Sequence, residues 1–391
     1  MSKITLLAQI VNDVIDKNAF ARIVKRHNSD KGCKKFDTWH QFVWMLVCHL
    51  ADCRSIRDVS NILQSTTGNL NHLGMGAAPS KSSVAYQNEH RGWEVFRDVY
   101  HLLLETLGQH LGVKLDFPDI GKKIQLLDST TVTLSVSAFP WATYSHEKGA
   151  IKIHTALDFE QDVPSFLLVT DGVEGDNEAA VKLPFKEGMV VVADRGYMDF
   201  KLLKHWDSKK VEFVVRHNPT IVYKVEEKRK LPKDASANIL SDEIILMTGA
   251  RSKEYGKRMR RVVARNEEHG YDVTLLTNNF EWSAATIAAL YKDRWYIETF
   301  FRSIKQLLRI KSFIGTKPNA VLTQVWTAMC AILLLKYIGA KSQLTWNLSN
   351  LVLFLRVNLF VKIRLWYWLN FPFQGKKPPK PAATLKQGVL F

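Results

Sequence analysis

The sequence predicts a mixed α/β protein with a helical N-terminal part. Apolar residues recur at helical spacing through roughly the first 110 positions. From Lys122 onward, short and nearly continuous apolar runs replace that pattern, as is typical of strands buried on both faces. A helical pattern returns near Tyr291 and continues toward the C-terminus. The order of helices, strands and helices indicates an all-α unit joined to an α/β domain.

Composition and charge favour a partner that carries negative charge. The chain has 391 residues, of which 46% are hydrophobic and 11% aromatic, enough to bury a large core in two or three domains. Lys and Arg outnumber Asp and Glu by 54 to 38, which gives a formal net charge of +16. Such an excess favours nucleic acid. Ribosome-associated and membrane-surface proteins share this charge, so it does not decide the function.

The cysteines and the N-terminal segment indicate an intracellular protein. The four cysteines, Cys33, Cys48, Cys53 and Cys330, have neither CxxC spacing nor the density of a secreted disulfide framework. The first 20 residues lack a basic segment followed by an apolar segment and a small-residue cleavage site. We therefore expect reduced thiols in a cytoplasm and no export.

The N-terminal third is predicted to be a series of helices. An Asp37 or Thr38 cap precedes the second helix, and Pro79, Ser80 and Ser82 open the last one, which continues to Leu107. A polar break over residues 65–76 separates this last helix from the others. The earlier helices are expected at residues 4–15, 39–50 and 55–63.

Short helices, a turn and a further helix resemble a helix-turn-helix arrangement. In that arrangement the last helix would contact DNA through Lys81, Gln87, Asn88 and Arg91. A helical bundle without DNA contact explains the same pattern, so both interpretations stay open.

Two aspartates follow apolar runs in the strand region. Asp128 comes after residues 124–127, and Asp194 comes after residues 189–193. A carboxylate in such a place lies where open α/β sheets usually bind their ligands. Either aspartate could instead be a turn or cap residue, since Asp-Ser and Asp-Arg-Gly are good turn formers.

Residues 291–311 are predicted to form one helix with an acid inside a cationic stripe. At about 100° per residue, the side chains of Tyr291, Arg294, Glu298 and Lys305 share a face roughly 60° wide. An apolar stripe beside this face would dock the helix on a sheet. Weak pairing between surface charges explains the same spacing.

Asp128, Asp194 and Glu298 have one chemical explanation in common. Cutting a phosphodiester and rejoining its 3′ end requires charge neutralisation, an activated water or hydroxyl, and a stabilised leaving oxygen. Two Mg²⁺ about 3.5–4 Å apart supply all three, and such hard cations prefer oxygen ligands. Asp128 would bridge both ions, Asp194 would hold one and Glu298 the other.

These residues also resemble a known family. The spacing of Tyr291, Arg294, Glu298 and Lys305 matches the YREK motif of DDE transposases from bacterial insertion sequences, in the insertion-sequence-four family. The surrounding segment RWYIETFFRSIKQ is also similar to that family.

The strand region extends this resemblance. LLDSTTVTL around Asp128 and VVADRGYMDF around Asp194 resemble the first and second catalytic-aspartate segments, and residues 148–159 resemble the hairpin between them. The resemblance covers about residues 120–340, while the N-terminal helices match only in general style.

The resemblance implies a ribonuclease H-like catalytic domain with a β-rich insertion. Asp128 would lie on its first strand, Asp194 on its fourth and Glu298 on a following helix. The implied organisation is a helical domain at residues 1–115 that binds DNA ends, a catalytic domain at 120–212 and 277–340, an insertion at 213–276, and a C-terminal helical segment with a basic tail at 341–391, a candidate for dimerisation.

The resemblance further implies contacts to DNA near the cleaved phosphate. Tyr291, Arg294 and Lys305 would bind phosphates, and the cationic stripe fits that role. Trp295 and Trp282 are candidates to stack on a flipped base in members that excise through a DNA hairpin, and a core role explains both tryptophans as well.

Further basic residues are expected to contact DNA: Arg302, Lys152, Arg195, Lys81 and Arg91. Arg195 could instead pair with a catalytic acid. His154 could act as a base, but a two-metal site needs none, so we expect a hydrogen-bonded histidine within the sheet.

The C-terminal part is strongly apolar but is not expected to enter a membrane. Residues 325–338 are too short for a bilayer, which needs about 20 residues. Residues 348–371, interrupted by Arg356, Lys362 and Arg364, are expected to form a core or dimer-forming helix.

The sequence therefore predicts a Mg²⁺-dependent DNA transposase of the bacterial cytoplasm and nucleoid. We expect two Mg²⁺ per active site, substitution by Mn²⁺, double-stranded DNA as transposon end and target, and a homodimer on DNA. A metal-dependent nuclease of the same fold and an inactive, transposase-derived DNA-binding protein are the alternatives. Three acids in a basic groove speak against the inactive protein, because they weaken phosphate affinity.

Overall fold

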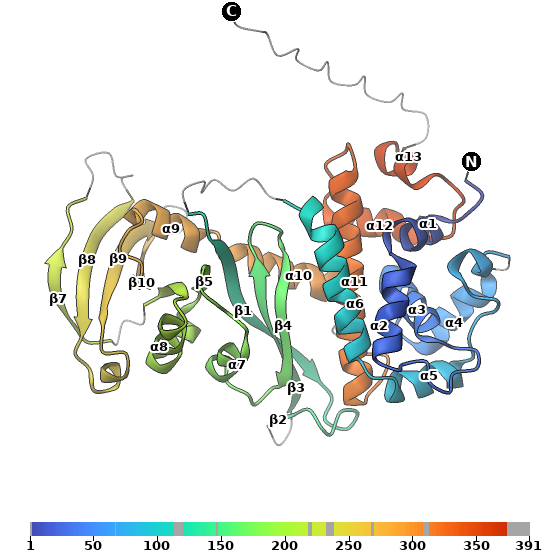
Figure 1. The fold of residues 1–391 in the computed structure, drawn as a ribbon, viewed down its shortest axis with the longest axis horizontal. Helices are drawn as coiled ribbons and strands as arrows, with labels where there is room; N and C mark the ends of the chain where they lie inside the picture. The colour runs from blue at the N-terminus through green and yellow to red at the C-terminus, as the bar shows by residue number, and fades with distance from the viewer. Residues whose placement is uncertain are drawn as a thin grey trace, which may run out of the picture.

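The computed structural model describes a helical bundle beside a large mixed sheet (Figure 1). The described residues are 2–66, 68–112, 120–145, 148–217, 221–231, 238–266, 270–307 and 313–373. The predicted mixed α/β class, with helices first and a sheet after them, is confirmed.

Capped helices build the N-terminal bundle. Side chains of Thr5, Asp16, Asp37, Ser55 and Ser80 accept hydrogen bonds from the first turns of their helices, which satisfies amides that have no helical partner. The helices are α1 (Leu6–Val14), α2 (Lys17–Arg26), α3 (Thr38–Leu50), α4 (Ile56–Ser65), η1 (Leu70–Leu73), α5 (Lys81–His90), α6 (Glu94–Leu107) and η2 (Gly108–His110).

The single helix expected up to Leu107 is wrong, because two helices occupy that stretch. Arg91 adopts an extended conformation with φ −76° and ψ 120°, which ends α5. Gly92 and Trp93 then redirect the chain into α6. The buried guanidinium of Arg91 holds this corner in place by donating hydrogen bonds to backbone carbonyl oxygens of the preceding loop.

One ten-stranded sheet contains every strand of the described residues. Its strands run in the order β2-β3-β1-β5-β6-β10-β9-β8-β7, and β4 pairs with β3 off this path. The strands are β1 (Lys123–Leu134), β2 (Thr143–Ser145), β3 (Lys148–Asp158), β4 (Val163–Asp171), β5 (Met189–Ala193), β6 (Glu212–Arg216), β7 (Tyr223–Lys228), β8 (Ile239–Met247), β9 (Arg258–Asn266) and β10 (Tyr271–Thr277).

The centre of the sheet is parallel and both sides are antiparallel. β5 lies between β1 and β6 and pairs in parallel with both. β10 then pairs with β6, and β9, β8 and β7 follow. The strands within residues 213–276 therefore extend the same sheet and are hydrogen-bonded to its centre (Figure 1).

Helices cover both faces of the sheet. On one face, α9 (Ala284–Lys292), α10 (Trp295–Leu307) and α11 (Pro318–Lys341) share a core with even-numbered β1 residues such as Leu126. On the other, α8 (Phe200–Ser208) and the short α7 (Asp176–Lys182) and η3 (Arg195–Tyr197) pack against odd-numbered residues such as Leu127. The short η4 (Ala250–Glu254) lies next to α8.

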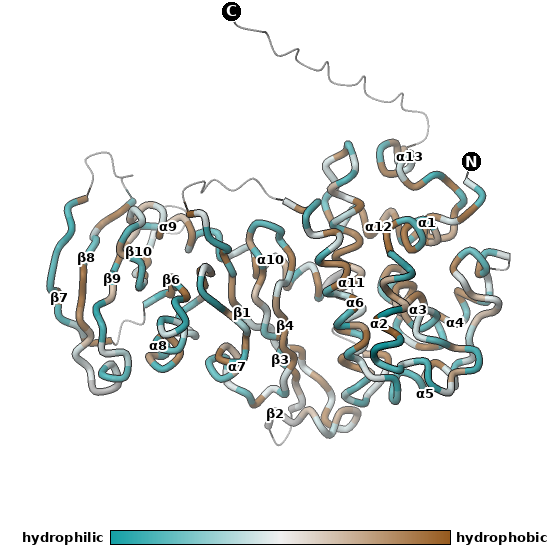
Figure 2. The backbone as a smooth tube through the Cα atoms, in the orientation of Figure 1, coloured by the Kyte–Doolittle hydropathy of each residue, from teal (hydrophilic) through white to brown (hydrophobic). Residues whose placement is uncertain are grey.

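The long helix α11 joins the bundle to the sheet. It is longer than the apolar stretch picked out in the sequence, and by length and composition it could cross a membrane. In the fold, 83% of its most apolar window is buried, as in the core helix of a globular protein, and Figure 2 shows its hydrophobic turns beside α6 and α3. The one helix expected over residues 348–371 is wrong. That stretch holds α12 (Leu348–Asn358) and α13 (Leu365–Asn370), and residues 374–391 lie outside the described chain.

Candidate active site

Asp128 and Asp194 lie side by side on one face of the sheet. Leu127 of β1 is the register partner of Ala193 of β5, so the two aspartates occupy the next position on neighbouring parallel strands. Side chains alternate along a strand. Because Leu127 and Ala193 face α7 and α8, both aspartates face α9 and α10.

Asp128 is not the last residue of its strand, as the sequence had suggested. β1 continues to Leu134 because β3 pairs with it over the whole length. Its parallel partner β5, however, ends at Ala193. Asp128 therefore lies where β1 no longer pairs with β5, and the end of that pairing opens space on that side of the sheet for a ligand.

The single helix predicted over residues 291–311 is wrong, because the chain bends between α9 and α10. Hydrogen bonds from the amides of Arg294, Tyr296 and Ile297 each reach a carbonyl only three residues back. This tighter winding separates α9 from α10. Glu298 consequently lies in the first turn of α10, and α10 packs against β1.

Arg294 links the helix to the sheet through two carboxylates. Its guanidinium forms an ion pair with Glu298 and lies 3.5 Å from Oδ2 of Asp128. It also lies 5.8 Å from the centre of the Tyr291 ring. Arg294 thus links Tyr291 and Glu298 to Asp128, and the charge of Asp194 also acts on Asp128. The Glu298 side chain remains 52% exposed, so it faces open solvent.

The charges of Asp194, Glu298 and Arg294 all act on the Asp128 carboxyl. The pKa of Asp128 is raised to about 6, mainly by burial and in smaller part by the negative charges of Asp194 and Glu298. The amide of Ser129, which donates to Oδ1 at 2.7 Å, and the charge of Arg294 oppose this rise. A cation placed among these carboxylates would relieve the repulsion that raises the pKa.

The donor set fits a hard divalent cation, although the carboxylates are not closed around one point. Among the described residues, no three His, Cys, Asp or Glu side chains are close enough to hold a metal ion in this conformation. The Arg294 guanidinium instead supplies the positive charge between Asp128 and Glu298. Oxygen-only donors at the edge of a sheet are the type that Mg²⁺ prefers.

A second polar cluster lies on the reverse face of β1, directly behind Asp128. The Ser129 hydroxyl donates to Asp176 at 2.7 Å, and Lys152 Nζ and His154 Nδ1 each lie 3.5 Å from the same carboxylate. His154 is fully buried and also contacts Thr170, as expected for a hydrogen-bonded histidine within the sheet. Lys152 points away from the acids and is paired, so a DNA contact does not fit its position.

The remaining predicted DNA contacts differ in exposure. Arg195, Arg302 and Lys81 are exposed, Lys305 is half-buried, and Trp295 is 48% exposed with its ring stacked on Tyr296. Trp282 is half-buried and packs against the core, which agrees with a core role.

The expected DNA contact by Arg91 does not fit the structure. Arg91 is buried, and its guanidinium donates to the carbonyl oxygens of Ser29, Phe36 and Asp37. Asn88 is also buried and accepts from Gln41. Both residues therefore hold the bundle together, and the face of α5 that carries them is not a DNA-reading face.

Sequence analysis missed Arg216, a cation at the same edge of the sheet. It follows β6 residue Val215, the register partner of Ala193, so Asp128, Asp194 and Arg216 occupy one level on three neighbouring strands. Its guanidinium lies 5.6 Å from the Tyr271 ring. The sequence did contain a signal, because Arg216 follows an apolar run just as the two aspartates do.

The fold defines a mixed α/β sheet domain joined to a helical bundle, and comparison with known proteins identifies the family. Residues 119–334 match the family described as transposase DDE domain. The chain therefore belongs to the DDE transposase family. Residues 2–76 match a domain family of unknown function, DUF4372.

Three relatives carry transposase names. A probable transposase for insertion sequence element IS5377 from Geobacillus stearothermophilus is 29% identical over 68% of this chain and 70% of its own length. The putative transposase y4zB of Sinorhizobium fredii is 29% identical over 68% and 74%, respectively. A putative transposase for element IS4SA from Synechocystis is 24% identical over 74% and 80%. The narrower assignment to the insertion-sequence-four family stays a prediction.

Proposed function

We propose that the protein binds the terminal repeats of its insertion sequence, cleaves them by metal-dependent phosphodiester hydrolysis and joins the freed 3′ hydroxyl to target DNA. The single observation that carries this proposal is the placement of Asp128 and Asp194 on neighbouring strands, with Arg294 linking Asp128 to Glu298. Charge coupling of Asp128 to both other acids supports it. The enzyme would act in the bacterial cytoplasm, on nucleoid DNA.

Asp128, Asp194 and Glu298 would hold two Mg²⁺, and Mn²⁺ would substitute. When bound, the ions supply charge neutralisation at the phosphate and activation of the attacking oxygen. The residues of the chain have separate tasks. Asp128 is fixed by the Ser129 amide, and Asp194 caps η3 through a hydrogen bond from the Gly196 amide, so both carboxylates are oriented before DNA binds.

Cations around the acids would position the DNA strand. Arg294 is pre-placed by its contacts with Asp128, Glu298 and Tyr291, and it would exchange carboxylates for phosphate oxygens. Arg216 lies on the strand next to Asp194, at the same edge. Burial raises the pKa of the Tyr291 hydroxyl, whereas the charges of Arg294 and Arg216 oppose that rise, which supports a place for both cations near Tyr291.

Substitution of Glu298 tests the catalytic assignment. Glu298→Gln keeps shape and removes a charged ligand, so we expect end binding to remain and cleavage in Mg²⁺ to fall by several decades, since metal-assisted chemistry supplies most of the rate. Gel shift and cleavage of labelled element ends measure the two steps. Glu281→Gln, an exposed glutamate before α9, is the matched control. Cleavage by Glu298→Gln at the wild-type rate would remove the mechanism.

A strand-transfer assay separates a transposase from a nuclease of the same fold. Precut element ends with a free 3′ hydroxyl are incubated with supercoiled target DNA and Mg²⁺. A transposase yields joined products that contain both DNAs, because the 3′ hydroxyl acts as the nucleophile. Degradation of the target without joined product would instead assign the nuclease activity alone.

A further inference from the structure

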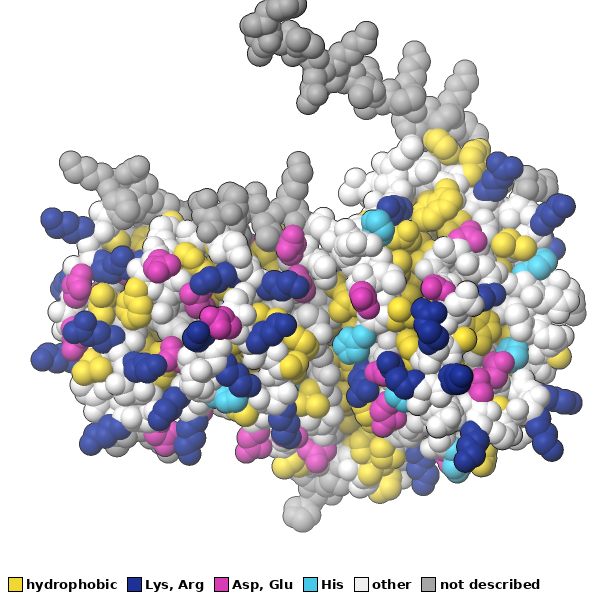
Figure 3. Space-filling view, viewed as in Figure 1, with side chains coloured by type: hydrophobic (Ala, Val, Ile, Leu, Met, Phe, Trp, Pro, Cys, Tyr) yellow, Lys and Arg dark blue, Asp and Glu magenta, His cyan; other side chains and the backbone are white. Residues whose placement is uncertain are grey.

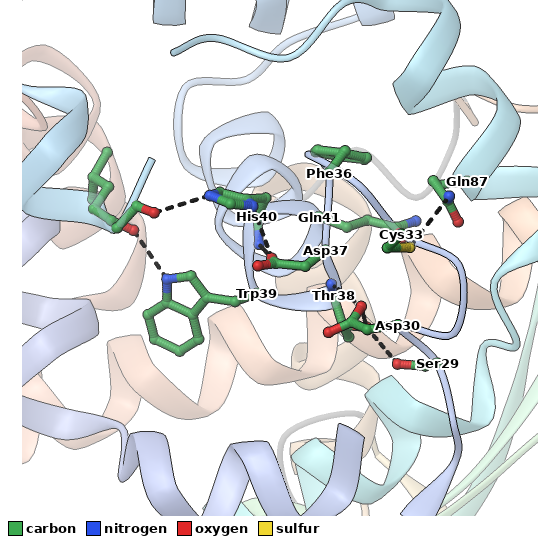
Figure 4. Close-up of polar contacts among 12 residues, drawn as sticks. Ser29, Asp30, Cys33, Phe36, Asp37, Thr38, Trp39, His40, Gln41 and Gln87 are labelled. Atoms are coloured by element: carbon green, nitrogen blue, oxygen red, sulfur yellow. Dashed lines mark hydrogen bonds and ion pairs between the residues drawn. The ribbon is translucent and has the colours of Figure 1, made fainter. Parts of the chain in front are cut away.

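The N-terminal bundle carries a basic loop that its own core holds rigid. Residues 27–35 connect α2 to α3 and turn through Asn28 and Gly32, whose φ angles of +49° and +75° lie in the left-handed region. Asp30 accepts hydrogen bonds from the amide and the hydroxyl of Thr38, both at 2.7 Å (Figure 4). These contacts tie the loop to the first turn of α3.

Arg91 fixes the loop from beneath. Its buried guanidinium donates to the Ser29 carbonyl at 3.2 Å, to the Phe36 carbonyl at 2.8 Å and to the Asp37 carbonyl at 3.2 Å. It also lies 3.0 Å from Cys33 Sγ. The buried Arg91 cation thus binds the backbone at both ends of the loop. The backbone that carries the outer side chains of the loop is therefore held in place.

Three lysines occupy the outer side of this rigid loop. Lys31, Lys34 and Lys35 are exposed, and among the described residues none has an acidic partner within ion-pair distance. The one acid of the loop, Asp30, is directed inward to Thr38 and Arg91. Three unpaired positive charges within five residues repel one another, and phosphate groups would relieve that repulsion.

An exposed aromatic pair faces the loop from α5. Tyr86 is 60% exposed and stacks on His90, with ring centres 4.1 Å apart and planes 15° apart. The His90 Nδ1 contacts the Tyr86 carbonyl at 2.8 Å, which holds the two rings in this arrangement. An exposed and oriented aromatic face beside cations is what a sugar or base of DNA contacts.

The loop and the aromatic pair line a single polar groove. The groove has a volume of about 550 Å³ and lies between residues 27–33 on one side and the segment from Tyr86 to Glu94 on the other. Lys and Arg side chains are spread over the face drawn in Figure 3, including the end that holds the bundle. Glu94 is the acid among the lining residues.

We propose that this groove, formed by residues 27–33 and the outer face of α5, binds the phosphate backbone of duplex DNA at the ends of the element. Lys31, Lys34 and Lys35 contact phosphates, and Tyr86 packs against the sugar or base next to them. The inference rests on the proposed function and deepens it, because it gives the segment that matches a domain of unknown function a ligand.

Removing the three lysines together tests the groove. The variant Lys31→Ala/Lys34→Ala/Lys35→Ala and the matched control Lys201→Ala/Lys204→Ala/Lys209→Ala lose the same charge from exposed positions, the control on α8 and its C-terminal cap. The probes are fluorescent duplexes with the two ends of the protein's own element, titrated by anisotropy over a range of salt concentrations. Circular dichroism checks the fold of each variant.

We expect the loop variant to bind at least about tenfold more weakly and its salt slope to fall by about 2.7, since each phosphate contact contributes about 0.9. The control variant should keep both values near wild type. Tyr86→Ala should weaken binding about fivefold or more through lost stacking, with little change of salt slope. Unchanged affinity and slope in the loop variant would overturn the proposal.

The same preparations distinguish this proposal from the proposed function. If the wild-type protein cleaves the ends in Mg²⁺ and the loop variant binds and cleaves equally well, the groove proposal alone is contradicted. If the wild-type protein binds through the groove but neither cleaves nor joins the ends, the catalytic proposal alone is contradicted. Protection of Lys31, Lys34 and Lys35 from acetylation in the complex gives a readout independent of catalysis.

Discussion

At the scale of single residues, the structure assigns Arg294 a double role. Its guanidinium balances Asp128 and Glu298, and the proposed reaction needs those carboxylates for cations. A positive charge within a few ångströms of a binding site repels a divalent cation. Arg294 should therefore weaken metal binding to the free protein and strengthen binding of the DNA strand.

We predict that Arg294→Ala binds Mn²⁺ about tenfold more tightly than wild type without DNA, and that it cleaves element ends more slowly. The gain follows from lost repulsion, and the loss follows from a missing phosphate contact. Calorimetric titration with Mn²⁺ and a cleavage assay measure the two effects. Arg302→Ala, which removes an exposed arginine from the same helix, should leave Mn²⁺ affinity unchanged. Equal affinity in wild type and Arg294→Ala would contradict the assignment.

His40 provides a pH-dependent contact in the N-terminal bundle. Its Nδ1 lies 2.8 Å from the Asp37 carboxylate and its Nε2 lies 2.9 Å from the Gly74 carbonyl (Figure 4). Because both partners are acceptors, the ring makes both contacts only as the doubly protonated cation. The hydrogen bond to Asp37 accordingly raises the pKa of His40.

We predict that this contact stabilises the protein in acid and is lost in base. A pKa raised in the folded state gives a contribution that is complete below the unfolded value of about 6.5 and disappears as pH rises through the folded value. The stability difference between wild type and His40→Asn should therefore shrink by about 0.5–1 kcal/mol between pH 5.5 and 8.5, since solvent screens the half-exposed Asp37. Urea unfolding at both pH values measures it, and a constant difference would exclude the ion pair.

At the scale of elements, the two faces of β1 have different tasks. Asp128 faces α10, whereas the next residue, Ser129, faces α7 and binds Asp176. The Ser129 amide holds the Asp128 carboxylate, so Asp176 positions a proposed metal ligand through one intermediate residue. Loss of a side chain that orients a metal ligand in this way commonly changes metal affinity 10- to 100-fold.

We predict that Ser129→Ala and Asp176→Asn each lower Mn²⁺ affinity about tenfold while leaving DNA binding unchanged. Both variants loosen the segment that orients Asp128 without removing a ligand. Thermal shift on adding Mn²⁺ and gel shift with element ends are the measurements. Glu174→Gln, which disturbs the neighbouring pair with Lys182, is the control. Normal Mn²⁺ affinity in both variants would show that the cluster is only structural.

The sequence predicted where helices and strands occur, but it did not predict where one helix ends and the next begins. Alternating and apolar runs placed the strands around Asp128 and Asp194, because buried strands have few other compositions. The bends at Arg91 and Arg294 had no local signal, since neither contains proline and both depend on contacts with distant residues. The YREK spacing nevertheless found Arg294 and Glu298, because residues four apart remain neighbours across the tight turn.

At the scale of the whole molecule, α11 makes the bundle and the sheet one unit. Its Thr327 contacts His49 of α3 at 3.0 Å, and Trp326 stacks on Trp93 with ring centres 6.3 Å apart. The Tyr100 hydroxyl of α6 donates to the Pro164 carbonyl of β4 at 2.6 Å. The sequence placed a boundary near residue 115 and could not show these contacts, because they join residues 64 to 278 positions apart.

We predict that Trp326→Ala destabilises the entire protein in one transition. Trp326 is buried among aromatic rings of α6, so its loss should cost about 3–5 kcal/mol. Tryptophan fluorescence and far-ultraviolet circular dichroism should report coincident unfolding curves. Trp366→Ala on α13, where the ring is 39% exposed, should cost much less. Two separate transitions, of which only one moves, would contradict the coupling of bundle and sheet.

The described strands within residues 213–276 are hydrogen-bonded through β6 to β5, the strand before Asp194. β10 is joined to β6, and β6 to β5, so the outermost strand β7 is tied to Asp194 through an unbroken ladder (Figure 1). A hydrogen-bonded sheet of this kind keeps the distance between β7 and Asp194 constant. A nucleic acid bound at β7 would therefore lie at a fixed distance from the proposed cleavage site.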